Sequence, residues 1–226
     1  MVVNTYLTVG LDNLDKKYFD PIDNSVFFKP ICGLWATKQK DDIINYNEWM
    51  DYLVNKDTST FFYKYQNYNF NIPAVFFTLK KQSKIYYIKS IKDLLSIMSA
   101  FPNKKDTWWH YKSKIPNLYY IDYEKVSNLY DGVFFDITSL FEEAQGDLLI
   151  EKDIINSFSV NTLILFNLDC IEYYQQTTIE VTPFECDYKK SRINCKINIS
   201  DEKQFVSDSR TDDEIRLIKQ SKYKFF

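Results

Sequence analysis

A strongly apolar run from Thr162 to Phe166 constrains the fold more than any other stretch of the chain. Four apolar residues follow Thr162 without a polar interruption, and Asn167-Leu168-Asp169 closes the run. Such uninterrupted apolarity over a short length is typical of a strand that is buried on both faces. The sequence therefore predicts a strand at 162–166 with side chains packed on each of its faces.

Shorter patterns predict the elements around this strand. Further strands are expected at residues 2–9, 74–79, 85–88 and 133–135, with a hairpin formed by 179–182 and 193–199. Helices are expected to begin after Asn45, Ser90, Asp122 and Thr211, each of which can cap a first turn. Glu48 and Glu214, three residues after Asn45 and Thr211, can complete capping boxes. This order of strands and helices favours an α+β fold.

The character of the sequence changes after Tyr174. Aromatic and apolar strand patterns give way to alternating and charged sequence, which leads to the short amphipathic helix expected after Thr211. We therefore expect a main domain over residues 1–174 and a C-terminal appendage over residues 175–226, built from a β-hairpin and a short helix. A chain that ends near Tyr174 is expected to keep the main fold.

The charge and the cysteines of the chain limit which partners and which cellular compartment are expected. The net charge is −3 without a strongly basic segment, so no nucleic-acid partner is expected. No apolar run approaches the roughly 20 residues that a membrane span needs, and no secretory signal pattern opens the sequence. The four cysteines contain no Cys-x-x-Cys pair. They are interpreted as reduced thiols of a cytoplasmic protein, with a Cys186–Cys195 disulfide as the alternative.

The chain lacks the residues that several common kinds of metal, nucleotide and catalytic site require. His110 is the only histidine and has no His or Cys at ligand spacing, so no metal site is expected. There is no Gly-x-x-x-x-Gly-Lys loop, no Gly-x-Gly-x-x-Gly fingerprint and no Gly-x-Ser-x-Gly elbow. A Ser-His-Asp or Cys-His arrangement would have to use His110, which has no cysteine near it in the sequence.

The run from Pro30 to Thr37 contains Gly33, one of only four glycines in 226 residues. A glycine on a loop or a strand edge lets the backbone approach a ligand closely. Beside it, Trp35 offers an aromatic face and Thr37 a hydroxyl group. One interpretation makes this run a wall of a binding cleft, and the other makes Trp35 a core residue under a turn.

Three pieces of the chain together resemble a diverged family of ADP-ribosyltransferase-like proteins. The first is the opening strand with Tyr6 and Thr8, and the second is Gly33-Leu34-Trp35-Ala36-Thr37 followed by Asn47-Glu48-Trp49. The third contains Tyr123-Glu124-Lys125-Val126 and Tyr130-Asp131-Gly132-Val133, and closes with Asn161 to Ile171. The resemblance covers about residues 1–174 and implies an α+β fold of split β-sheets flanked by short helices.

The resemblance implies that a cleft between two small sheets holds NAD as a substrate. The implied NAD-binding residues are Tyr6, Thr8, Gly33, Leu34, Trp35 and Thr37. Tyr6 and Thr8 would face the nucleotide, and Gly33 and Leu34 would offer backbone groups to the nicotinamide amide. Trp35 would form a wall of the pocket, and Thr37 would contact a ribose.

The resemblance also implies a carboxylate at the reacting bond. Breaking the nicotinamide–ribose bond builds positive charge on the sugar, which a carboxylate stabilises. Enzymes of this family usually place a Glu at the start of a late strand, whereas this chain has Asn161 there. Either Asp131 or the Glu142/Glu143 pair takes that place, or Asn161 only orients the ribose, or transfer activity is lost. The candidate catalytic residues are therefore Asp131 and Asn161, although Asp131 with the glycine after it is also typical of a helix end and turn.

The resemblance implies an NAD-dependent mono-ADP-ribosyltransferase, a glycosyl-transferring enzyme that modifies a protein target. The alternative is a catalytically inactive module that uses the same cleft, or the C-terminal appendage, to grip a partner protein. Abundant Lys, Asn, Ile, Tyr and Phe with few Gly and Ala are typical of AT-rich coding. A protein target in a host or a competitor organism would fit this AT-rich coding.

Overall fold

The fold is described from a computed structural model, which describes residues 5–24, 29–39, 48, 70–104, 119–144, 158, 160–182, 194–214 and 216. Several predicted features lie outside these residues. They are residues 2–4 of the first strand, the helix expected after Asn45 except Glu48, the neighbourhood of His110, and the side chains of the Cys186–Cys195 pair.

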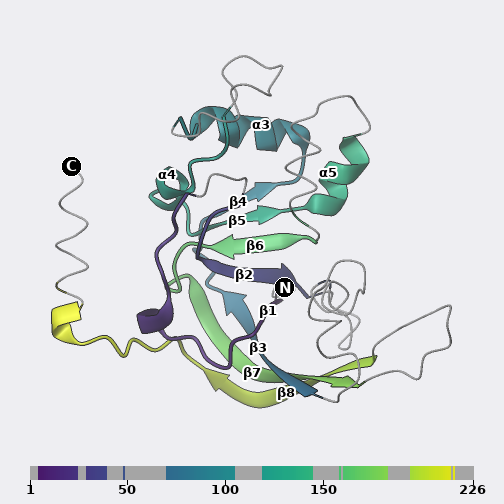
Figure 1. Ribbon diagram of the computed structural model, residues 1–226, viewed down its shortest axis with the longest axis vertical. Helices are drawn as coiled ribbons and strands as arrows, with labels where there is room; N and C mark the ends of the chain where they lie inside the picture. The colour runs from purple at the N-terminus through teal and green to yellow at the C-terminus, as the bar shows by residue number, and fades with distance from the viewer. Residues whose placement is uncertain are drawn as a thin grey trace.

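The described residues form an eight-stranded sheet with short helices (Figure 1). The strands are β1 (Thr5–Val9), β2 (Leu34–Lys38), β3 (Phe70–Leu79), β4 (Ile85–Ile88), β5 (Gly132–Phe135), β6 (Thr162–Leu165), β7 (Ile171–Thr182) and β8 (Asn194–Gln204). The helices are the 3-10 turn η1 (Lys16–Tyr18), α3 (Ile91–Ala100), α4 (Tyr123–Ser127) and α5 (Ile137–Glu143). The predicted α+β class is confirmed. Of the helices described, none is both long and apolar enough to cross a membrane.

The strands follow one continuous order, β4-β5-β6-β2-β1-β3-β7-β8, so the expectation of two split sheets is corrected. The two halves join where β1 pairs with β2, with Tyr6 opposite Lys38 and Leu7 opposite Thr37. We call this short junction the seam. Because few residues hold it, the halves can differ in direction, and in Figure 1 β7 and β8 curve away from β4 and β5. The helices α3, α4 and α5 gather at the β4–β5 end of the sheet (Figure 1).

Three apolar clusters cover the faces of the sheet. The first packs α3, α4 and α5 against one face of β4, β5 and β6. The second crosses the seam, because it contains Tyr6 of β1 together with Leu163 of β6. The third contains Leu7, Ile179 and Ile197 and lies on the other face of β1, β3, β7 and β8. The second cluster therefore holds the two halves of the sheet together.

The strand β6 is buried along its whole length. Its side chains alternate between clusters, since Leu163 and Leu165 belong to the second and Ile164 to the first. The predicted burial of this strand on both faces is confirmed.

The predicted helix starts after Ser90, Asp122 and Thr211 are also confirmed. The side chains of Ser90 and Asp122 each accept a hydrogen bond from the backbone N–H three residues later. Thr211 N donates to Glu214 Oε2 over 2.7 Å, and Glu214 N donates to Thr211 Oγ1 over 3.3 Å. These caps depend only on residues three positions apart, which is why the sequence predicts them.

The strands β3 and β4 follow one another in the chain but lie in opposite halves of the sheet. The turn between them is fixed to the start of β7, because Lys80 N and Ser83 Oγ both donate to the carbonyl oxygen of Cys170. β4 then pairs in parallel with β5.

The domain boundary predicted after Tyr174 falls inside β7. This strand continues to Thr182, pairs with β3 along its length, and forms the predicted hairpin with β8. Beyond β8, Ser207 N donates to the carbonyl oxygen of Leu14 over 3.1 Å, and Lys16 N donates to that of Ser207 over 3.0 Å. Residues 175–182 and 194–204 therefore belong to the sheet rather than to a peripheral appendage.

Asp122 joins α4 to the loop that precedes β2. Its carboxylate accepts hydrogen bonds from Asn24 Nδ2 at 2.8 Å and from Lys125 N at 3.2 Å, and it pairs with Lys125 Nζ at 2.6 Å. Burial by itself would raise the pKa of Asp122, but the hydrogen bonds from Lys125 and Asn24 outweigh it and hold this pKa below its ordinary value.

We expect Asp122→Ala to lower the free energy of unfolding by about 1–2 kcal/mol at neutral pH, because a cap and a tie to Asn24 are lost. The folded state favours the ionised Asp122 carboxylate. Its contribution to the free energy of unfolding is therefore fully present above the unfolded pKa of about 4, and it is lost as the pH falls through the lower pKa of the folded state. Denaturant unfolding at neutral and acidic pH measures both effects. Asp201→Ala on the exposed surface of β8 is the control. If Asp122→Ala lowered the free energy of unfolding by the same amount at acidic pH as at neutral pH, this result would contradict the role of the carboxylate charge.

Candidate functional site

A pocket of about 180 Å³ opens at the seam of the sheet. It is lined by Tyr6, Lys38, Glu48, Tyr87, Lys89, Phe134, Asp136 and Asn161. Tyr6 and Lys38 are paired across the seam, and most of the other residues come from the adjoining ends of β4, β5 and β6. We call it the seam pocket.

Glu48 and Asn161 are joined by two hydrogen bonds in the seam pocket. The backbone N of Asn161 donates to Glu48 Oε2 over 2.8 Å, and Asn161 Nδ2 donates to Glu48 Oε1 over 3.1 Å. Asn161 Oδ1 accepts a hydrogen bond from Thr138 N over 3.1 Å. These contacts orient the amide and place a carboxylate directly beside the residue that precedes β6.

Other charged side chains line the same pocket. Asp136 caps α5, because its Oδ1 accepts a hydrogen bond from Ser139 N over 3.1 Å. Lys89 Nζ lies 5.1 Å from the centroid of the Tyr87 ring, and Lys38 lies across the seam from Tyr6. Two carboxylates and two ammonium groups therefore line one small space, which suits a ligand with both positive and negative charge.

Tyr6 supplies a neutral hydroxyl to the pocket. Its side chain is 1% exposed, and its ring stacks on Phe77 with the centroids 5.7 Å apart. Burial raises the pKa of Tyr6 far above its ordinary value, and the neighbouring Tyr87 raises it further. Tyr6 therefore stays protonated throughout the physiological pH range. The Tyr87 ring lies 5.7 Å from that of Phe134, so it is held at the pocket by a second aromatic contact.

The seam pocket brings together two of the predicted site residues, Tyr6 and Asn161. Thr8 lies two residues further along β1, pairs with Val75 of β3 and is 3% exposed, and it does not line the seam pocket. Leu34 lies at the opposite end of β2 and lines a different pocket.

Trp35 and Thr37 lie on the other face of β2. Side chains alternate along a strand, so these two point away from the face that carries Lys38. Trp35 packs against the first apolar cluster and stacks on Phe158 at 5.9 Å, whereas Tyr6 belongs to the second cluster. The prediction that Tyr6, Gly33, Trp35 and Thr37 line one concave surface near the start of the 162–166 strand is therefore wrong. Trp35 is a partly buried core residue, as the alternative interpretation holds.

Gly33 forms a tight turn before β2. Its φ is 77°, and a Cβ at this position would lie 2.9 Å from the carbonyl oxygen of Leu165. Cys32 also has a positive φ of 65°, and its carbonyl oxygen accepts a hydrogen bond from Trp35 Nε1 over 3.0 Å. The turn and its contact with β6 by themselves require a glycine here.

Asp131 lies at the opposite end of the strands from Asn161. The four residues of β5 separate it from Asp136, which shares the seam pocket with Asn161. At ~3.3 Å per residue this separation is about 16 Å. Asp131 Oδ2 accepts a hydrogen bond from Lys84 N over 2.8 Å, and Oδ1 accepts one from Asn167 Nδ2 over 3.0 Å. The structure therefore does not bring the two candidate catalytic residues together.

The carboxylate beside Asn161 is Glu48, which the sequence predicts as a helix-capping residue and which the resemblance includes in Asn47-Glu48-Trp49 without a catalytic role. The other candidates lie elsewhere, since Glu143 Oε2 accepts a hydrogen bond from Ile91 N over 2.9 Å and Glu142 is exposed on α5. Glu48 and Asn161 are 113 residues apart, and no spacing or motif indicates that they meet. Their contact becomes visible only in the folded structure.

No protein-family model matches the chain, and comparisons with curated proteins and with solved structures give no match either. Within the part of the chain that the structure describes, no group of three or more His, Cys, Asp or Glu side chains is placed to hold a metal ion. The seam pocket and the resemblance carried by the sequence are therefore the features of the chain that bear on its function.

Proposed function

We propose that the chain is an NAD-dependent ADP-ribosyltransferase that modifies a protein, with the nicotinamide–ribose end of NAD in the seam pocket. The observation that carries the proposal is the pair of hydrogen bonds between Glu48 and Asn161. They put a carboxylate beside the position where the resemblance implies one. The strands β1, β2 and β6, which contain parts of all three resembling pieces, are also neighbours in the sheet.

In the proposed reaction, the bond between ribose C1′ and the nicotinamide nitrogen breaks, and its electron pair leaves with nicotinamide. A nucleophile of the target protein forms the new bond to C1′ and loses its proton. Positive charge develops on the ribose as the first bond breaks, and the Glu48 carboxylate stabilises it. Asn161 holds that carboxylate in place, which is a positioning role.

The size and charge of the seam pocket support binding of one end of a dinucleotide. Its volume of about 180 Å³ lies below the roughly 300–1,000 Å³ of a site that encloses a drug-sized ligand. The pocket would therefore take the nicotinamide end, with the rest of NAD outside it. Lys38 and Lys89 can attract the pyrophosphate, and the Tyr87 ring offers a flat surface for stacking.

Incubation of the chain with NAD labelled in its adenylate half and a cell lysate tests the proposal. We expect release of nicotinamide and label that remains on a protein after denaturation, because the transferred ADP-ribose is covalently attached. Chain unfolded by heat beforehand is the control and should give neither. A native chain that neither binds NAD in calorimetry nor releases nicotinamide would contradict the proposal.

A catalytically inactive binding module with the same fold is the second candidate. Both oxygens of Glu48 already accept hydrogen bonds from Asn161, so the carboxylate also fixes the segment around residue 48 to β6. In such a module, replacement of Glu48 would change stability alone, and the pocket would hold a ligand without cleaving it.

A further inference from the structure

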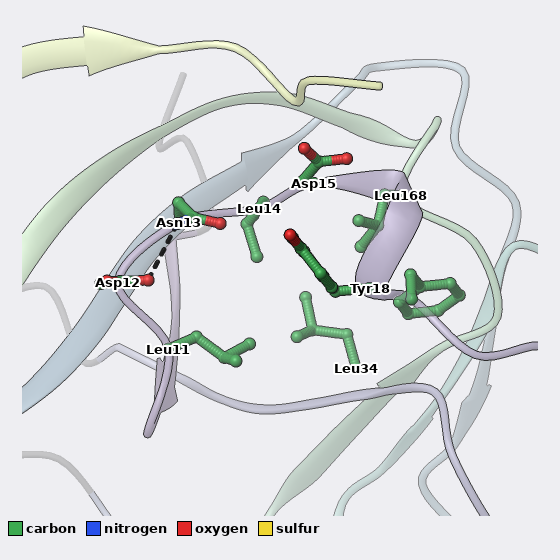
Figure 2. Close-up of a pocket in the computed structure, with 9 residues that line it drawn as sticks. Leu11, Asp12, Asn13, Leu14, Asp15, Tyr18, Leu34 and Leu168 are labelled. Carbon is green, nitrogen blue, oxygen red and sulfur yellow. Dashed lines mark hydrogen bonds between the residues drawn. The ribbon is translucent and has the colours of Figure 1, made fainter. Parts of the chain in front are cut away.

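A second pocket, of about 280 Å³, lies at the end of β2 away from the seam pocket (Figure 2). Four leucines line it: Leu11 and Leu14 from the loop after β1, Leu34 from β2, and Leu168 from the turn after β6. We call it the leucine pocket. Leu14, Leu34 and Leu168 are almost fully buried, whereas Leu11 is 39% exposed, so the pocket opens to the surface beside Leu11.

The rim of the leucine pocket is polar. Figure 2 shows Asp12, Asp15 and Tyr18 beside the leucines. Tyr18 lines the pocket and yet is 77% exposed. Exposed tyrosines of this kind are enriched at protein interfaces. An apolar floor within a polar rim is the arrangement that receives a single anchoring side chain of a partner.

The rim carries negative charge, because among the described residues the basic side chains near it already pair with other carboxylates. Arg210, whose charge also acts on Asp15, pairs with Asp208. Lys16 already pairs with Asp169, and Lys17 Nζ lies 3.8 Å from Glu214 Oε1. Within the described part of the chain, the Asp12 side chain accepts a hydrogen bond only from Asn13, the next residue, and it is exposed. A cationic group of a partner would therefore find an accessible carboxylate at the mouth of the pocket.

A second rim carboxylate is held in its ionised form. Asp15 Oδ1 accepts hydrogen bonds from Lys17 N over 2.8 Å and from Ser209 N over 3.1 Å. Hydrogen bonds from Ser209 and Lys17 lower the pKa of Asp15 to about 2. This side chain therefore keeps its negative charge at neutral pH.

We propose that the leucine pocket binds a protein segment in which a leucine-sized apolar side chain is flanked by lysine or arginine. The apolar side chain would enter between the leucines, and the basic side chains would lie against Asp12 and Asp15. The same negative charge would repel the phosphates of nucleic acids and of anionic lipids. The proposal does not rest on NAD chemistry, since the leucine pocket and the seam pocket share no residue.

Titration with short capped peptides, followed through leucine methyl signals in NMR spectra, tests this proposal. The probe peptide contains Lys-Leu-Lys between glycines, and its controls contain Lys-Ala-Lys and Glu-Leu-Glu. A single anchor with two exposed ion pairs is expected to bind with a Kd of about 1 mM. Loss of the apolar anchor or reversal of the flanking charges should weaken binding about tenfold.

The pattern of shifted methyl signals locates the binding site. We expect the Lys-Leu-Lys peptide to shift the methyls of Leu11, Leu14, Leu34 and Leu168 and to leave Leu94 of α3 unchanged. No shift of the pocket methyls at about ten times the expected Kd would overturn the proposal. Equal binding of the Glu-Leu-Glu peptide would overturn it as well.

Asp12→Asn and Asp201→Asn form a matched pair of variants for the charge. Both side chains are exposed, so neither change should unfold the protein. Asp12→Asn should weaken binding of the Lys-Leu-Lys peptide about threefold. Asp201→Asn, on β8, should leave binding unchanged. If the two variants weakened binding equally, only the overall charge of the protein would matter, and the proposed contact of the peptide with the rim carboxylates would be overturned.

Discussion

A chain that ends at Tyr174 will lose cooperative thermal unfolding. The truncation removes most of β7 and all of β8, and it leaves β3 unpaired on that side from Phe70 to Phe76. It also removes Ile179 and Ile197 from the third apolar cluster. Burial of each such side chain contributes about 1.5–3 kcal/mol. Together with the lost strand ladder, this is comparable to the whole stability of a domain, about 5–15 kcal/mol.

Thermal unfolding followed by circular dichroism measures this effect. A chain that ends at Arg216 is the control, because it retains every strand that the structure describes and should melt cooperatively. A chain of residues 1–174 that melts in one transition near the temperature of the full chain would restore the interpretation of residues 175–226 as an appendage.

Glu48→Gln should slow NAD turnover by about 10²–10³-fold, the usual effect of removing one electrostatic group that stabilises a transition state. Glutamine is close to glutamate in shape and can still accept a hydrogen bond from Asn161 N, but it carries no charge. We therefore expect the folded state to survive with a loss of about 1 kcal/mol. Nicotinamide release and thermal unfolding, measured on the same preparation, separate the two effects.

Glu172→Gln is the matched control for Glu48→Gln. Glu172 is exposed on β7 and does not line the seam pocket, so turnover should match that of the wild type. The loss in Glu48→Gln should appear in kcat more than in KM, because the carboxylate acts on charge that develops only as the bond breaks. A lower melting temperature with unchanged turnover would mean that Glu48 only fixes its segment to β6.

The features that the sequence predicts correctly depend on neighbouring residues. The burial of β6 follows from its apolar run, and the caps at Ser90 and Asp122 follow from short spacing and the preferences of helix ends. The hairpin of β7 and β8 follows from alternation in two adjacent segments. In each case a local preference and the final packing agree, so no distant contact is needed to make the prediction.

The features that the sequence misses depend on contacts between distant residues. The meeting of Glu48 with Asn161 and the parallel pairing of β4 with β5 leave no local pattern. The error at Trp35 has a different cause, because the run after Gly33 is a regular strand whose alternation separates Trp35 from the face of Lys38. The boundary after Tyr174 fails because a change in composition occurs within β7.

Nicotinamide release by Glu48→Gln and Asp131→Asn, measured side by side, tests the role of the seam pocket most directly. Asp131 is bound to Lys84 N and Asn167 at the far end of β5, so Asp131→Asn should lower stability by about 1 kcal/mol and leave the rate of release unchanged. Glu48→Gln should reduce that rate by about 10²–10³-fold. Full activity in Glu48→Gln together with a large loss in Asp131→Asn would contradict the assignment of the reacting bond to the seam pocket.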